Sequence, residues 1–185
     1  MGKAFDYIES DYYRYTGERA SRAKLIKDAV LGRKKAYKYC FWFRLAHFKN
    51  PMQLLAKLMH RILSNRYKVF IPRDTEIGYG FYIGGPCFAV IINGTTKIGN
   101  NVNVSQYLNI GTNNKTPAII GNCVYIGPHV SIVDDVIIED FATIGAGAVL
   151  TKRIPKNSTA VGVPAKVISY DNPGRFINNP VDWIG

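Results

Sequence analysis

The chain of 185 residues is long enough for one domain, or for a small domain attached to a repeat array, and 47% of its residues are hydrophobic. The formal net charge of +11 comes from residues 1–70, which hold 16 Lys and Arg against 5 Asp and Glu, whereas residues 71–185 hold 8 of each. This distribution argues against a protein that binds nucleic acid over its whole surface. It predicts either an N-terminal surface that meets an anionic partner or a solvated basic helix face.

The three cysteines, Cys40, Cys87 and Cys123, are far apart and lack metal-ligand spacing. We therefore expect a reducing compartment and no bound metal. The first ten residues have no apolar signal-peptide core, and no run approaches 18 apolar residues. These features predict a cytoplasmic protein with no membrane-spanning segment.

The first 70 residues are predicted to be helical. Residues 1–18 suggest a short helix that ends near Gly17, and residues 19–49 suggest a helix that is broken near Gly32. The pair Asn50-Pro51 is a stop signal.

An amphipathic helix is predicted after this stop, because apolar residues recur there at helical spacing. These residues are Leu54, Leu55, Leu58, Met59, Ile62 and Leu63. We expect the stripe to pack on the first β-coils or on a neighbouring subunit. The alternative is peripheral association with the inner face of a membrane, because residues 34–48 mix cations with Phe, Trp and Tyr in the manner of interfacial helices.

The second half of the chain repeats every six residues. Large aliphatic residues occupy Ile120, Ile126, Ile132, Ile138, Ile144 and Leu150, and an earlier run has Ile92, Ile98, Val104 and Ile110, with Ile77 and Ile83 as its possible start. Neither a helix nor a strand alone has this period, whereas a triangular coil with one short strand per face does. The sequence therefore predicts a parallel β-helix rather than an ordinary sandwich, with glycine after the aliphatic residue at tight bends.

Three hexads per turn predict coils that begin near Ile77, Ile98, Ile120 and Ile138. The same count stacks Ile83, Val104, Ile126 and Ile144 in one column. The six-residue repeat is interrupted at residues 84–91 and 112–119. We thus expect a mainly β chain with a helical basic lead-in at 1–70, a β-helix at 71–168 and a C-terminal tail at 169–185.

Three segments carry a family resemblance: IGNNVNVSQYLNIG (98–111), IGNCVYIGPHV (120–130) and IGAGAVLTKRIPKNSTAVGVPAKVI (144–168). They resemble the left-handed β-helix hexapeptide acyltransferases, with serine acetyltransferases and the O-acetyltransferases of bacterial surface saccharides as the nearest branch. The resemblance implies a left-handed β-helix, a homotrimer and acetyl-CoA as co-substrate. It also implies a histidine, oriented by a carboxylate, that deprotonates an acceptor hydroxyl.

The chain departs from this pattern at the catalytic positions. Gly85 stands where the resemblance places the histidine, and Thr116 stands where serine acetyltransferases have a second one. The substitute base predicted from the hexad count is His129, which should lie near the same edge as Gly85 but two layers away. His47 and His60, in the lead-in, are expected to be packed or solvated.

Binding residues are expected on the last coil and on the loops. For acetyl-CoA they are Ala146, Gly147, Lys152, Arg153 and Lys166, which combine small residues with positive charge. For the acceptor they are Gly85, Asn113 and Asn114.

The predicted function is acetyl-CoA-dependent O-acetylation of a small-molecule or glycan hydroxyl, foremost a surface saccharide or its precursor. One alternative is a serine O-acetyltransferase. The other is a catalytically silent β-helix that binds CoA or only assembles.

Overall fold

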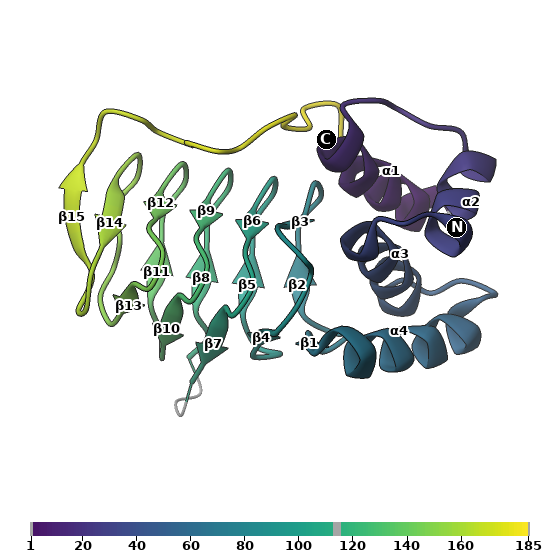
Figure 1. Ribbon diagram of the computed structural model, residues 1–185, viewed down its shortest axis with the longest axis horizontal. Helices are drawn as coiled ribbons and strands as arrows, with labels where there is room; N and C mark the ends of the chain where they lie inside the picture. Colours follow the sequence, from purple (N-terminus) through teal and green to yellow (C-terminus); the bar gives the residue numbers. More distant parts are fainter. Residues whose placement is uncertain (1, 113–115, 185) are drawn as a thin grey trace.

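Four helices precede a stack of short strands in the computed structural model, which describes residues 2–112 and 116–184 (Figure 1). The helices are α1 (Gly2–Thr16), α2 (Arg22–Leu31), α3 (Lys35–His47) and α4 (Gln53–Tyr67). The break expected near Gly32 separates α2 from α3. Ser21 caps α2, because its side chain accepts a hydrogen bond from the Lys24 amide.

The strands form three parallel faces of a β-helix. One sheet contains β1 (Val69–Phe70), β4 (Val90–Ile92), β7 (Asn109–Gly111), β10 (Ser131–Val133) and β13 (Val149–Leu150). The second contains β2 (Glu76–Ile77), β5 (Lys97–Ile98), β8 (Ile119–Ile120) and β11 (Ile137–Ile138). The third contains β3 (Tyr82–Ile83), β6 (Asn103–Val104), β9 (Tyr125–Ile126), β12 (Thr143–Ile144), β14 (Thr159–Val161) and β15 (Lys166–Ser169).

The predicted register is confirmed on each face. Ile77, Ile98, Ile120 and Ile138 pair in order on the second sheet, and Ile83, Val104, Ile126 and Ile144 pair in order on the third. These aliphatic side chains are at most 6% exposed, so they fill the interior of the coils. The last strand departs from the pattern, since β15 pairs with β14 in the antiparallel direction after the chain reverses at Gly162, where φ is +97°.

Most glycines that follow the aliphatic residues are explained by close stacking rather than by the expected bend, although a Cβ on Gly111 would meet nothing within 4 Å. A Cβ on Gly99 would lie 2.8 Å from the backbone carbonyl carbon of Gly121 in the next coil. Left-handed φ values occur instead at later corner residues such as Asn101, Cys123 and Phe141. Contact between the layers therefore selects glycine at Gly78, Gly99 and Gly121.

The amphipathic assignment of α4 is confirmed only in part. Leu63 is buried, but Leu54, Leu55, Leu58 and Ile62 are 83%, 47%, 56% and 48% exposed. The stripe therefore does not pack on the first β-coils of this chain, and its packing on a neighbouring subunit stays a prediction. The buried positions of α4 are Ala56, Leu63, Ser64 and Tyr67.

The interfacial assignment of residues 34–48 is also wrong. In α3 the aromatic residues Tyr37, Tyr39, Phe41, Trp42 and Phe43 are all at most 7% exposed. Helix α3 packs against α1, α2 and α4, so its aromatic residues form the core of the helical half. Among the described residues, no helix combines the length and apolar character needed to cross a bilayer.

A buried ion pair joins the helices to the first coil. The Arg44 guanidinium contacts both carboxylate oxygens of Asp11, at 2.8 and 3.0 Å, and donates to the carbonyls of Ile77 and Gly78. Asp11 in turn accepts the Phe81 amide at 2.8 Å. This network fixes how the helical half sits on the β-helix.

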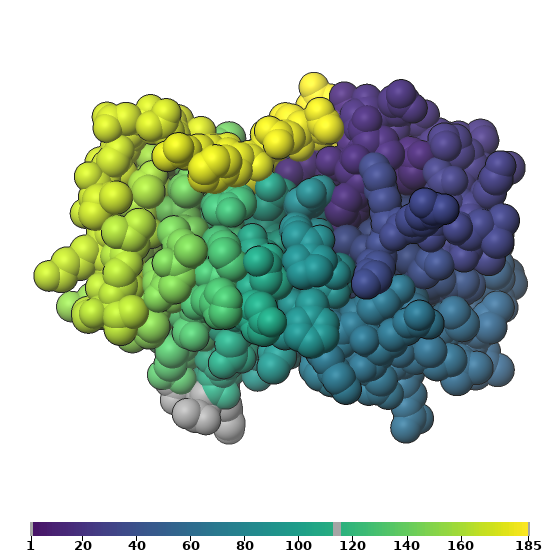
Figure 2. All heavy atoms as spheres, in the orientation of Figure 1, coloured from purple at the N-terminus to yellow at the C-terminus, as the bar shows by residue number. Residues whose placement is uncertain are grey.

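The C-terminal tail runs back along the β-helix to α1 (yellow in Figures 1 and 2). Asn101 exchanges two hydrogen bonds, each 2.9 Å, with the backbone of Val181. Trp183 packs edge-on against Tyr13 of α1, with ring centroids 4.5 Å apart. The tail thus connects the coils to the first helix.

Candidate functional site

The third sheet passes into the first sheet at one edge of the β-helix, and several predicted site residues lie there. The His129 amide donates to the Gln106 carbonyl at 3.1 Å, and the Gly147 amide donates to the Pro128 carbonyl at 2.9 Å. These bonds stack successive corners above one another. The structure therefore brings His129 and Ala146–Gly147 to the edge that begins at Gly85.

Gly85 lies at the start of this edge and has no side chain of its own. Its φ is +61°, and a Cβ built there would lie 2.5 Å from Oε1 of Gln106. The Gln106 amide thus occupies space that a side chain at position 85 would need. Because glutamine carries no titratable group, this corner has no proton acceptor of its own.

His129 lies on the same edge, as the hexad count predicts. Its φ is +59°, its side chain is exposed, and its ring stacks on Tyr107 with centroids 4.4 Å apart and planes inclined by 15°. No hydrogen bond joins this ring to a carboxylate within residues 2–112 and 116–184. Its role as a base stays a prediction, and the stacking defines its orientation.

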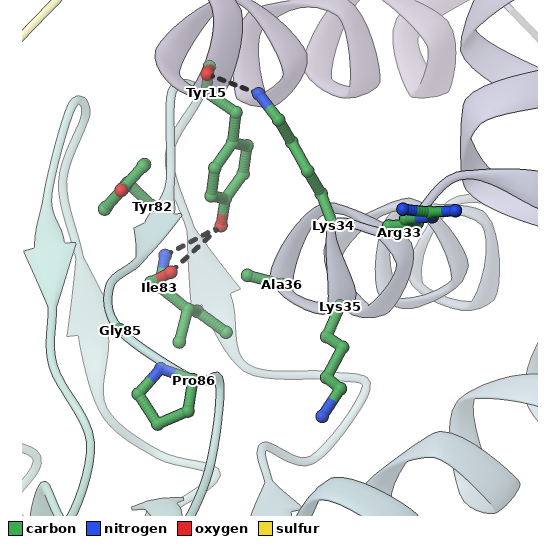
Figure 3. A pocket seen from close by; sticks show the side chains of 9 residues that line it. All are labelled: Tyr15, Arg33, Lys34, Lys35, Ala36, Tyr82, Ile83, Gly85 and Pro86. Atoms are coloured by element: carbon green, nitrogen blue, oxygen red, sulfur yellow. Dashed lines mark hydrogen bonds between the residues drawn. The ribbon is translucent and has the colours of Figure 1, made fainter.

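A pocket of about 400 Å³ opens beside Gly85, between the helical half and the first coil (Figure 3). One wall carries Arg33, Lys34 and Lys35, from the α2–α3 connection and the start of α3. The other carries residues of β3 and the following corner. The full lining is Tyr15, Arg33, Lys34, Lys35, Ala36, Tyr82, Ile83, Gly85 and Pro86.

Tyr15 fixes the floor of this pocket and does not supply a base. Its hydroxyl accepts the Ile83 amide at 2.9 Å, and its ring lies 4.5 Å from that of Tyr82. Burial raises the pKa of Tyr15 well above its usual value. The phenol therefore stays protonated at neutral pH.

Cys87, on the loop after Gly85, is equally unsuited to act as a nucleophile. Burial raises the pKa of its thiol to about 12, and the nearby charge of Lys35 offsets only part of that effect. The thiolate that would react is therefore scarce at neutral pH.

The residues predicted to bind the cofactor lie on two different corners. Ala146 and Gly147 are exposed, and a Cβ on Gly147 would meet nothing within 4 Å. Lys166 lies in β15, opposite Val161 at the end of β14, beside this corner. Lys152 and Arg153 lie on the next corner, after β13, where Arg153 pairs with Glu139 through an Nε–Oε1 contact of 2.6 Å.

The other predicted residues divide into described and undescribed ones. Asn113 and Asn114, expected at the acceptor, lie outside the described residues. His60 is packed as expected, with its Nε2 2.9 Å from the Tyr39 hydroxyl. His47 places Nδ1 2.7 Å from the Arg73 carbonyl oxygen. In the described parts of the chain, no three His, Cys, Asp or Glu side chains gather as metal ligands.

Sequence reasoning missed the cations at 33–35, Tyr15 and Gln106. Gln106 follows Val104 by two residues, as Gly85 follows Ile83, so the hexad count itself could have identified it. The position of the cations depends instead on how α3 docks on the first coil, and no periodic signal encodes that.

Comparison with known proteins gives one family for this chain. Residues 117–152 match the model described as "Bacterial transferase hexapeptide (six repeats)". The serine acetyltransferase of Helicobacter pylori strain J99 is 30% identical, over 70% of this chain and 78% of the relative.

Two other relatives are matched over less of their own length. The mitochondrial serine acetyltransferase 3 of Arabidopsis thaliana is 32% identical over 75% of this chain, which spans only 37% of that relative. The galactoside O-acetyltransferase of Escherichia coli K12 is 36% identical over 54% of this chain and 55% of the relative.

Solved structures agree with this fold over nearly the whole chain. Soybean serine acetyltransferase, as the apoenzyme, has a TM-score of 0.74 and 26% identity, and covers 91% of this chain and 70% of its own. A serine acetyltransferase in complex with CoA has a TM-score of 0.72 and 21% identity, and covers 90% and 70%. The chain thus belongs to the hexapeptide-repeat transferases with a left-handed β-helix, the family that includes the serine acetyltransferases.

Proposed function

We propose that this protein is an acetyl-CoA-dependent O-acetyltransferase of the serine acetyltransferase type. The observation that carries the proposal is the alignment of the Gly85, Gln106, His129 and Ala146–Gly147 corners along one edge, in a chain whose relatives are O-acetyltransferases. L-serine is the first acceptor to test. A saccharide hydroxyl is the second, and the E. coli galactoside O-acetyltransferase favours it.

Acetyl-CoA fits the open corner at Ala146–Gly147. Because no side chain covers Gly147, a pantetheine arm can approach the backbone there. Lys166 beside this corner and Lys152 on the next are exposed cations that suit the CoA phosphates. Arg153 is less suited, since Glu139 already neutralises part of its charge.

The transfer needs a proton acceptor near the thioester. The acceptor hydroxyl oxygen attacks the carbonyl carbon, the carbon–sulfur bond breaks, and CoA leaves as the thiol once it receives the proton. We propose His129 as the group that takes the hydroxyl proton and returns it to the thiolate, because it is the histidine on this edge.

The test measures CoA release and the mass of the acetylated product with L-serine and with methyl galactoside. We expect product with at least one acceptor, and a loss of about 10²-fold in rate for His129→Gln. His47→Gln, which changes a histidine remote from the edge, serves as the control. Binding of acetyl-CoA without any acetylated product would favour the second candidate, a silent CoA-binding β-helix.

A homotrimer is proposed as the working assembly. The first sheet exposes Phe70, Ile91 and Val133, which are 43%, 47% and 39% exposed. Flat β-helix faces with such apolar residues are suited to side-by-side packing around a threefold axis.

We also propose that α4 docks on an anionic membrane from the cytoplasmic side. Its exposed stripe is flanked by Lys57, Arg61 and Arg66, none of which forms an ion pair in the described parts of the chain. The sequence from residue 29 to residue 73 has no Asp or Glu. Apolar insertion flanked by cations fits anionic lipid headgroups, whereas a second copy of α4 would bring like charges together.

Sedimentation with vesicles tests this surface. We expect binding to vesicles of phosphatidylcholine with phosphatidylglycerol, and about tenfold weaker binding for a Leu54→Ser, Leu58→Ser double variant. Leu31→Ser, on a 75% exposed residue of α2, is the matched control. Equal binding to pure phosphatidylcholine would overturn the proposal, as would a double variant that changes the oligomeric mass in solution.

A further inference from the structure

The pocket beside Gly85 carries an unusual concentration of positive charge. Arg33, Lys34 and Lys35 are consecutive and exposed, and no Asp or Glu is among the nine residues that line the pocket. Arg33 and Lys35 belong to none of the ion pairs found among the described residues. The carboxylate of Asp28, on the preceding helix, is occupied by Tyr12 and Lys24.

The backbone under these cations does not offset their charge. Helix α3 begins at Lys35, its N-cap Lys34 makes no side-chain capping bond, and its first turn has no acidic residue. Cations at a helix N-terminus are unfavourable, since the helix dipole is positive there. An anion in the pocket would relieve both this repulsion and that among the three side chains.

The opposite wall of the pocket is rigid. Tyr15 is held by the Ile83 amide, and Lys34 donates to the Tyr15 carbonyl oxygen at 2.8 Å. Figure 3 shows this bond, with Lys35 extending in the opposite direction from Lys34 and Pro86 lying across the pocket. A molecule in the pocket would thus lie between the cations and the Gly85 corner.

We propose that this pocket holds the phosphate group of a phosphorylated acceptor, with the acceptor's hydroxyl presented toward the Gly85 edge. This proposal rests on the proposed acetyl transfer, because the acceptor's hydroxyl is the group that would be acetylated. It adds the chemical class of the acceptor. A cavity of about 400 Å³ can admit a sugar phosphate, and the cations that line it suit a phosphate dianion.

Binding is measured by calorimetry without acetyl-CoA, so that the result does not depend on turnover. The probes are galactose 1-phosphate, galactose, L-serine and inorganic phosphate. We expect galactose 1-phosphate to bind at least tenfold more tightly than galactose, and Arg33→Gln or Lys35→Gln to weaken that binding about tenfold. Inorganic phosphate should compete with it.

The matched control is Lys38→Gln, which removes a cation from the same helix outside the pocket, where Lys38 donates to the Val30 carbonyl at 2.9 Å. Equal affinities for galactose and galactose 1-phosphate would overturn the proposal. A Lys38→Gln variant that loses as much affinity as Lys35→Gln would also overturn it, because general charge would then explain the binding. Specific phosphate binding without any acetyl transfer would uphold this pocket and refute the proposed enzyme.

Discussion

Most residues at the Gly85 edge and its pocket have no group that can act as a base at neutral pH. Gly85 has no side chain, Gln106 has no titratable group, and Tyr15 keeps its proton. His129 remains as the exposed histidine, stacked on Tyr107. In the proposed mechanism, proton transfer therefore depends on a residue held by aromatic stacking rather than by a carboxylate.

His60 should make stability depend on pH. Burial lowers its pKa to about 4, whereas the unfolded chain has the ordinary value near 6.5. Between these values the unfolded state binds more protons than the folded state. The contribution of His60 to the free energy of unfolding is therefore complete above pH 6.5 and is lost as the pH falls toward 4. In urea titrations, we expect the free energy of unfolding to fall by about 1–3 kcal/mol less in His60→Gln than in the wild type as the pH falls from 6.5 to 4. Identical profiles for wild type and His60→Gln would contradict the prediction.

At the scale of elements, Arg14 of α1 joins three parts of the molecule. Its guanidinium donates to the Gly80 carbonyl at 2.6 Å, the Asn103 side chain at 2.5 Å and the Asn178 carbonyl at 2.9 Å. It thereby links a helix, two coils and the tail at a position that is 3% exposed.

Arg14→Gln should lower the free energy of unfolding by about 2–4 kcal/mol, because it leaves buried acceptors unpaired. Arg19→Gln removes an exposed pair with Glu9 and should cost much less, because solvent screens the two charges. Urea denaturation compares the two variants. Equal losses for the two variants would show that the buried Arg14 contacts do not hold α1, the coils and the tail together.

At the scale of the whole molecule, the proposed trimer depends on the first sheet. Ile91→Glu places a charge on that face and should reduce the mass in light scattering from three times 20.7 kDa to that of one chain. Leu31→Glu, on α2, should leave the mass unchanged. A trimer that survives Ile91→Glu would place the interface elsewhere.

The sequence predicted the register of the β-helix and the helix boundaries near Gly17, Gly32 and Asn50-Pro51, but not how the helices pack. The hexad count placed Ile77 over Ile98 and Ile83 over Val104, because each coil position repeats the same packing environment. Helix α4 exposes its predicted stripe, since its spacing gives an apolar face but not the partner of that face. The pocket cations depend on the Asp11–Arg44 contact, which joins residues 33 positions apart and leaves no periodic trace.

The central claim is that the edge at Gly85 is where acetyl transfer takes place. CoA release by wild type, Gly85→His and Gly85→Ala measures it most directly, since both substitutions displace the Gln106 amide but only one adds an imidazole. The account predicts that Gly85→His is at least about tenfold faster than the other two, because it adds a second imidazole to the edge on which His129 lies. Equal rates for Gly85→His and Gly85→Ala would contradict it.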